Sequence, residues 1–170
     1  MSSWSLLLPR DVRNHISSYL DQNESYYPVI NYKKYLIIYV ADDNDMDYDI
    51  KYMINLQELF CNNNTNFSDE GIKKINNLQV LHCGENKNFT DKGLCHLTNL
   101  QQLYCWYNNN FTDVGLKYLI NLQKLDCWDN TNFTDKGIKH LNNLQELDCG
   151  LNTNFTNEGI KHLINLNIYW

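Results

Sequence analysis

The chain has 170 residues and a formal net charge of -6, and an acidic chain of this kind repels nucleic-acid phosphates. Hydrophobic residues make up 43% of it, but no apolar run approaches the roughly 18 residues that a membrane-spanning helix needs. We therefore expect a soluble globular protein that binds neither nucleic acid nor a membrane.

Residues 1–33 differ from the rest of the chain. Val12, Ile16 and Leu20 recur at helical spacing after Pro9, which predicts an amphipathic helix that begins near the proline. Residues 1–9 contain no basic n-region and no cleavage-like site of small residues, so secretion is not expected. The expected location is the cytoplasm.

Residues 8–20 read LPRDVRNHISSYL and resemble the opening of an F-box. In F-box proteins this segment docks the adaptor subunit of a cullin-based ubiquitin ligase. The resemblance implies that five residues make this contact: Leu8, Pro9, Val12, Ile16 and Leu20. A helix that only caps the following array would use the same residues, so docking and capping both remain open.

Residues 34–55 form a degenerate first repeat of that array. A shift by one repeat aligns Ile37 with Leu59 and Ile50 with Ile72 (59 − 37 = 22). An acidic turn at residues 42–45 replaces the Asn-Phe motif of the later units with solvated charge. We predict that this segment covers the end of the regular array, because a terminal repeat otherwise exposes its core.

Residues 56–170 form a tandem array that ends in a truncated unit. Its period is constant (78 − 56 = 22), and each unit reads L-x-x-L-x-C-x-x-N-x-N-F-[ST]-[DN]-x-G-[IL] with few departures. The first leucines of the units are Leu56, Leu78, Leu100, Leu122, Leu144 and Leu166. Such a period indicates a solenoid in which each unit buries its apolar side against its neighbours.

Each unit predicts one short strand and one short helix. The alternation of Leu59 and Cys61 turns one side of the strand inward, and Asn64 can then satisfy backbone groups at the corner as one member of a buried ladder. Thr90 before Asp91 is a helix N-cap followed by an acid in the first turn. We expect a parallel concave sheet with short helices on the convex side, an α/β solenoid with an N-terminal helical cap.

The unit resembles the leucine-rich repeat, with cysteine where the third leucine usually stands. Its F-T-D-x-G-[IL]-x-x-L tail is similar to the cysteine-containing subclass found in F-box substrate receptors, and the resemblance covers residues 34–170. The abundance of Asn, Tyr, Ile and Lys also resembles the short repeat proteins of giant DNA viruses of amoebae. The resemblance implies a protein-interaction module.

Residue patterns for other chemistry are weak. The chain has 6 cysteines without a C-x-x-C pair, and five share the inward strand position, so we expect core thiols rather than disulfides or metal ligands. His96, His140 and His162 share one position with Lys74 and Tyr118, which suits a solvated surface. No nucleophile, base and acid recur as a set, so no enzyme activity, metal or cofactor is expected.

Function is therefore expected on the concave face, where side chains vary between units. Aromatic residues crowd the middle units with acidic residues around them, which favours a partly basic protein or peptide as partner. The candidate residues are Phe60, His82, Tyr104, Trp106, Tyr107, Asp126, Trp128, Asp129, Glu146 and Asp148. The alternative is that these aromatics only pack on one another along the sheet and bind nothing.

The function that follows is a non-enzymatic interaction module, which the F-box-like segment would make a substrate receptor of a cullin ubiquitin ligase. Two alternatives stay open. The concave face could serve an inhibitor or decoy that blocks a host protein. The open C-terminal edge near Ile168 could instead join copies, giving a homodimer or a self-associating structural protein.

Overall fold

The computed structural model describes residues 30–31, 35–37, 50, 56–64 and 67–170. The predicted F-box-like helix, with Leu8, Pro9, Val12, Ile16 and Leu20, lies outside the described residues. Within the described part, no helix is long and apolar enough to span a membrane.

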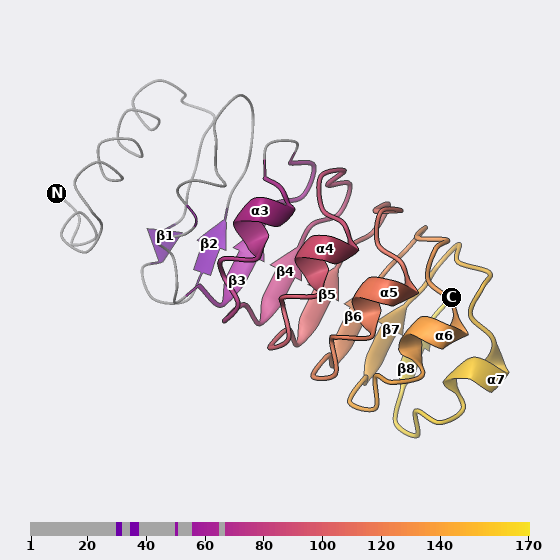
Figure 1. Cartoon of the computed structure of the whole chain (residues 1–170). Helices are drawn as coiled ribbons and strands as arrows, with labels where there is room; N and C mark the ends of the chain where they lie inside the picture. The colour runs from indigo at the N-terminus through magenta and orange to yellow at the C-terminus, as the bar shows by residue number, and fades with distance from the viewer. Residues whose placement is uncertain (1–29, 32–34, 38–49, 51–55, 65–66) are drawn as a thin grey trace, which may run out of the picture.

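One strand per unit builds a single sheet, as predicted (Figure 1). Strand β2 and all later strands run parallel, and β1 pairs antiparallel with β2. The strands are β1 (Ile30–Asn31), β2 (Tyr35–Ile37), β3 (Glu58–Phe60), β4 (Val80–His82), β5 (Gln102–Tyr104), β6 (Lys124–Asp126), β7 (Glu146–Asp148) and β8 (Asn167–Tyr169). Figure 1 shows them following one another in chain order, with the helices in a second row beside them.

Each helix in the described part of the chain is a single turn of 4 residues. The helices are α3 (Asp69–Ile72), α4 (Asp91–Leu94), α5 (Asp113–Leu116), α6 (Asp135–Ile138) and α7 (Asn157–Ile160). Their predicted N-caps are confirmed: the side chains of Ser68, Thr90, Thr112, Thr134 and Thr156 each accept a hydrogen bond from a backbone N–H of the first turn.

Leucine and cysteine side chains fill the inside of the array. Leu103 on β5 and Cys105 directly after that strand are completely buried, as are the equivalent residues at β3, β4 and β6. All described cysteines are free thiols, and burial raises the pKa of Cys105 well above its ordinary value, so this thiol stays protonated and behaves as a small apolar group. The predicted column of core cysteines is confirmed.

A buried asparagine lies at the corner after every strand from β3 to β7, also as predicted. The Nδ2 of Asn130 donates to the carbonyl oxygens of Asn108 at 2.7 Å and Phe111 at 3.4 Å, both in the preceding unit. Its Oδ1 accepts from the backbone N–H of Asn132 at 3.0 Å. One side chain thus satisfies polar backbone groups of two units that are shut off from water.

Two further rows of asparagines join the units at the surface, and our sequence interpretation missed both. Asn121 Nδ2 donates to the carbonyl of Thr98 at 2.9 Å, and Asn132 Nδ2 donates to that of Asn109 at 2.6 Å. Equivalent bonds recur in neighbouring units. Much of the asparagine content is therefore structural.

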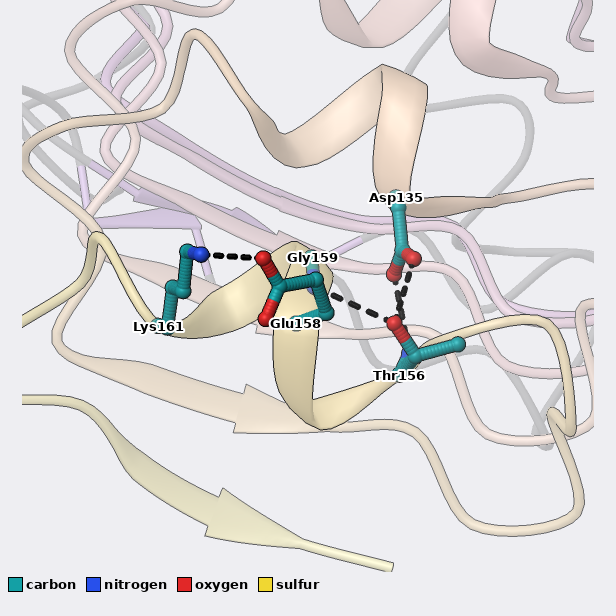
Figure 2. Close-up of polar contacts among 5 residues, drawn as sticks. All are labelled: Asp135, Thr156, Glu158, Gly159 and Lys161. Atoms are coloured by element: carbon teal, nitrogen blue, oxygen red, sulfur yellow. Dashed lines mark hydrogen bonds and ion pairs between the residues drawn. The ribbon is translucent and has the colours of Figure 1, made fainter.

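The first helical residue also couples neighbouring units. Asp135 Oδ1 accepts from the backbone N–H of Thr156 at 2.9 Å, and its Oδ2 accepts from the Thr156 hydroxyl at 2.7 Å (Figure 2). The helical glycine makes room for this clamp: a Cβ on Gly115 would lie 2.5 Å from Asp91 Oδ1 of the preceding unit. The tightest contact of the glycine position is therefore with the aspartate of the preceding unit.

The strand of the degenerate repeat is shifted by one residue from our alignment. Leu36, and not Ile37, pairs with Leu59 on β3. Ile50 is nevertheless buried like Ile72, its partner in the repeat alignment. The segment between this strand and Ile50 is therefore one residue longer than in a regular unit, which a fixed shift cannot reproduce.

Candidate partner-binding face

The outward strand residues form two rows on the face opposite the helices. Every strand from β3 to β7 buries its middle residue and leaves the flanking two partly exposed. The near row contains Glu58, Val80, Gln102, Lys124 and Glu146, and the far row contains Phe60, His82, Tyr104, Asp126, Asp148 and Tyr169. The register places each residue directly beside its row neighbours.

The far row begins as a stack of three rings. The centroids of Phe60 and His82 lie 3.9 Å apart with 12° between their planes, and those of His82 and Tyr104 lie 4.1 Å apart at 5°. Burial lowers the pKa of His82 to about 4, so its ring is neutral at pH 7 although Glu58 Oε1 lies 3.7 Å from Nε2. These three rings pack on one another along the sheet, which is the arrangement that the lateral-packing alternative describes.

The far row then changes to two aspartates. Burial, with a smaller contribution from the charge of Asp148 beside it, raises the pKa of Asp126. Lys124 is the cation in the described chain that influences this carboxylate, but its Nζ pairs with Glu146 at 2.7 Å and lies 5.5 Å from the Tyr104 ring centroid. Within the described chain, the two aspartates therefore carry neighbouring charges without an ion-pair partner.

A second aromatic group follows the strands. Tyr107 meets Trp106 and Trp128 edge to face, with centroids 5.9 and 4.8 Å apart. The Trp106 ring lies against the backbone of Gly84, and the Trp128 ring lies against that of Gly150, so closely that a Cβ on either glycine would collide with indole atoms. Tyr107 keeps 43% of its surface exposed. We call Trp106, Tyr107 and Trp128 the aromatic cluster.

A residue in the left-handed conformation turns the chain after each strand from β3 to β7, and two of these residues are predicted site residues. Tyr107 and Asp129 have φ values of 55° and 56°, and the other members of this set are Asn63, Glu85 and Leu151. Asn and Asp tolerate this conformation, whereas Tyr, Glu and Leu are strained in it. The backbone therefore projects Tyr107 and Asp129 from equivalent corners of neighbouring units.

The structure brings the predicted residues to one face but divides them into groups. Phe60, His82 and Tyr104 form the stack, Asp126 and Asp148 form the acidic part of the far row, and Glu146 is held by Lys124. The contacts of the tryptophan rings with Gly84 and Gly150 were not predicted from the sequence. A signal was available, since glycine occurs at this position only in the units flanking the two tryptophans.

The predicted solvated histidines His96, His140 and His162 are exposed. Within the described residues, no group of three or more His, Cys, Asp or Glu side chains could hold a metal ion.

The family model for leucine-rich repeats in two copies matches residues 98–140. This match falls on two consecutive units of the strand, asparagine corner and helix described above. The chain has the leucine-rich repeat fold. Comparison with curated proteins by sequence found no match.

Solved structures agree with the leucine-rich repeat fold. A leucine-rich repeat protein of Leptospira interrogans is 24% identical over 77% of this chain and 34% of its own, with a TM-score of 0.57. The functional domain of InlJ from Listeria monocytogenes, which includes a cysteine ladder, is 26% identical over 71% and 26%, with a TM-score of 0.54. A chain of the yeast Rad7 and Elc1 complex is 17% identical over 80% and 42%, with a TM-score of 0.60.

The chain spans less than half of the length of each of these three structures. Domains of this fold are in general non-enzymatic protein-interaction modules, which present an extended concave surface to their partners.

Proposed function

We propose that this protein is a non-enzymatic interaction module that binds a partly basic protein or peptide on its concave face. The observation that carries the proposal is the contrast between a repeated scaffold and the partly exposed aromatic cluster with aspartates beside it. Tryptophan and tyrosine in such positions dominate the binding energy of interfaces. The aspartates and the net charge of -6 favour basic partners.

The test is a pull-down from a eukaryotic cytosolic extract, with partners identified by mass spectrometry. The full chain is compared with a Trp106→Ala, Trp128→Ala variant and with a matched Tyr118→Ala control, whose tyrosine is 41% exposed outside the proposed face. Partners that are lost only from the tryptophan variant support the proposal, provided that circular dichroism shows that variant folded. An unchanged partner list contradicts it.

A second candidate is a substrate receptor of a cullin ubiquitin ligase. The LPRDV motif supports it, and Leu8, Pro9, Val12, Ile16 and Leu20 would contact the ligase adaptor. A chain that begins at Asn23 keeps the concave face but removes this segment. Adaptor captured only by the full chain would support the receptor, whereas identical partner lists without adaptor would favour an inhibitor or decoy.

Self-association through the C-terminal edge is the remaining candidate. Strand β8 pairs with β7 on one side, and Tyr169 and Trp170 are 56% and 60% exposed. Sedimentation velocity over a hundredfold range of protein concentration tests it. A constant sedimentation coefficient would contradict a homodimer, and a rise that Ile168→Asp abolishes would support one.

We propose a cytoplasmic location, which the free buried thiols support because a reducing compartment keeps thiols from forming disulfides. The composition resembles that of proteins of giant viruses of amoebae. If the protein is viral, the proposed location is the host cytoplasm. Fluorescence microscopy of the tagged full chain in an amoeba would test the location, and a signal confined to the secretory pathway would contradict it.

A further inference from the structure

The far row offers a defined place for one kind of partner side chain. The sheet register sets Tyr104 beside Asp126, Asp126 beside Asp148, and Asp148 beside Tyr169. Neighbouring strands lie about 4.8 Å apart, so the two tyrosines are roughly 14 Å apart with only short side chains between them. We call Asp126 and Asp148, which lie between the two tyrosines, the acidic step.

Backbone groups hold both carboxylates of the acidic step. Asp126 Oδ1 accepts from the N–H of Trp128 at 3.4 Å, and Asp148 Oδ1 accepts from the N–H of Gly150 at 3.3 Å. These contacts engage one oxygen of each aspartate through its neighbouring turn. The aspartates are therefore oriented by the same turns that carry Trp128 and Gly150.

The charges of the acidic step are not balanced from within the described chain. Lys124 is the cation that lowers the pKa of Asp126, but this is a smaller effect than burial, and its ammonium is paired with Glu146. Two adjacent, partly buried carboxylates repel each other, and a cation placed between them would remove that repulsion. The sheet face thus shows charge complementarity toward a positively charged partner group.

The geometry favours a guanidinium over a metal ion or an ammonium. A metal site of the usual kind needs at least three ligands, and no such group exists among the described residues. A guanidinium is planar, donates up to five hydrogen bonds in fixed directions, and stacks on aromatic rings. It can bridge carboxylates on two strands while its face lies on a flanking tyrosine, whereas an ammonium can only bridge them as a point charge.

We propose that the acidic step binds an arginine side chain of the partner, bridged by Asp126 and Asp148 between Tyr104 and Tyr169. The aromatic cluster beside it would contact the flanking apolar part of the same segment. This inference rests on the proposed function and adds the identity of one partner residue.

The experiment starts from a library of random short peptides displayed on phage and selected on the full chain. Peptides released by competition with soluble chain are synthesised, and their affinities are measured by fluorescence anisotropy. We expect a recurrent arginine whose replacement by lysine weakens binding at least fivefold, and whose replacement by neutral citrulline weakens it more.

Matched protein variants locate the contact. Asp126→Asn and Asp148→Asn keep an oxygen for the backbone N–H, and each should weaken arginine peptides about tenfold. Glu158→Gln removes the same charge on helix α7, where Glu158 is exposed and pairs with Lys161 away from the concave face, so it should change affinity less than twofold.

The outcomes separate this inference from the proposed function. Peptides that need Trp106 and Trp128 but bind equally to both asparagine variants would overturn the arginine site and leave the concave interface standing. A selection in which no peptide responds to the tryptophan or the aspartate substitutions would overturn both.

Discussion

The inside of the array and its concave face share the same strands but follow opposite rules. Inside, Leu103, Cys105 and Asn108 occupy positions that barely change from unit to unit and are almost entirely buried. Outside, the residue paired with Tyr104 is a histidine on one side and an aspartate on the other. Packing and hydrogen bonding therefore dictate the inner positions, whereas the outer ones are free to encode recognition.

This contrast teaches where a substitution should act. Changes inside should lower the free energy of unfolding, because they break contacts between neighbouring units. Changes outside should alter partner binding with smaller effects on folding. The following variants test whether inner positions control stability more strongly than outer positions do.

The largest effect is expected from Asn130→Leu, which has a similar volume but no polar atoms. It leaves the carbonyls of Asn108 and Phe111 and the N–H of Asn132 without their partner, so unfolding free energy should fall by about 3–5 kcal/mol. Urea denaturation followed by circular dichroism measures this. The control is Asn121→Ala, which loses one exposed bond and should cost about 1 kcal/mol or less. Equal losses of unfolding free energy in the two variants would contradict a greater contribution of the buried asparagines to stability.

Cys105→Ser should cost about 1–3 kcal/mol, because it buries a hydroxyl among apolar side chains. Cys95 lies at the C-cap of α4 and is partly exposed, so Cys95→Ser should be close to neutral. Thermal and urea unfolding of both variants would compare the two environments. A neutral Cys105→Ser would contradict the apolar character of the column.

Asp135→Ala should destabilise the last units by about 1–2 kcal/mol, since it removes both bonds to Thr156 (Figure 2). Figure 2 also shows the matched control: Glu158 pairs with Lys161 in an exposed i,i+3 contact, and Glu158→Ala should cost less than about 0.5 kcal/mol. Amide hydrogen exchange over residues 150–170 would localise the effect. Faster exchange in both variants alike would mean that the clamp does not couple the units.

Leu151→Asn should raise the stability by about 0.5–1 kcal/mol. Leu151 has a φ of 63° and is 62% exposed, so the change relieves backbone strain without removing core packing. Leu151→Ala serves as control, because alanine keeps the unfavourable Cβ and should gain nothing. A melting temperature that rises equally in both would attribute the gain to lost surface hydrophobicity.

The last prediction concerns the pH dependence of stability, because the pKa of His82, about 4, lies below the ordinary 6.5. Between these values the unfolded chain binds a proton that the folded chain excludes, so the stability from the neutral ring is complete above pH 6.5 and declines as the pH falls toward 4. His82→Phe removes this dependence and keeps a ring in the stack. The difference in unfolding free energy between the two proteins, measured from pH 7 to pH 4, should move in favour of the variant. A constant difference would mean that Glu58 compensates the proton.

The inner framework could be predicted from sequence because each of its positions is repeated. The same leucine, cysteine and asparagine positions occur in five units. Only one strand period and one corner position are consistent with all five. The register of β2 could not be predicted, since the degenerate repeat contains one extra residue whose position only the pairing of Leu36 reveals. Periodicity transfers between units only while their length is constant.

The concave face was predictable in membership but not in arrangement. Alternation places Tyr104 and Asp126 outward, yet it does not show that rings stack from Phe60 to Tyr104 or that Lys124 turns to Glu146. Those choices depend on rotamers and on neighbours one whole repeat away in the sequence. The aromatic cluster shows this most clearly, because its tryptophans point in opposite directions along the array.

That divergence limits how the array can have grown. Repeat arrays lengthen when a unit is copied beside itself, which works only if a unit fits against its own duplicate. Trp106 leans onto Gly84 of the preceding unit and Trp128 onto Gly150 of the following one. A copied Trp106 unit would set the indole against another tryptophan instead of a glycine, and a copied Trp128 unit would do the same. We therefore expect single-unit duplication to disrupt packing in the units that carry the aromatic cluster more than in the other units.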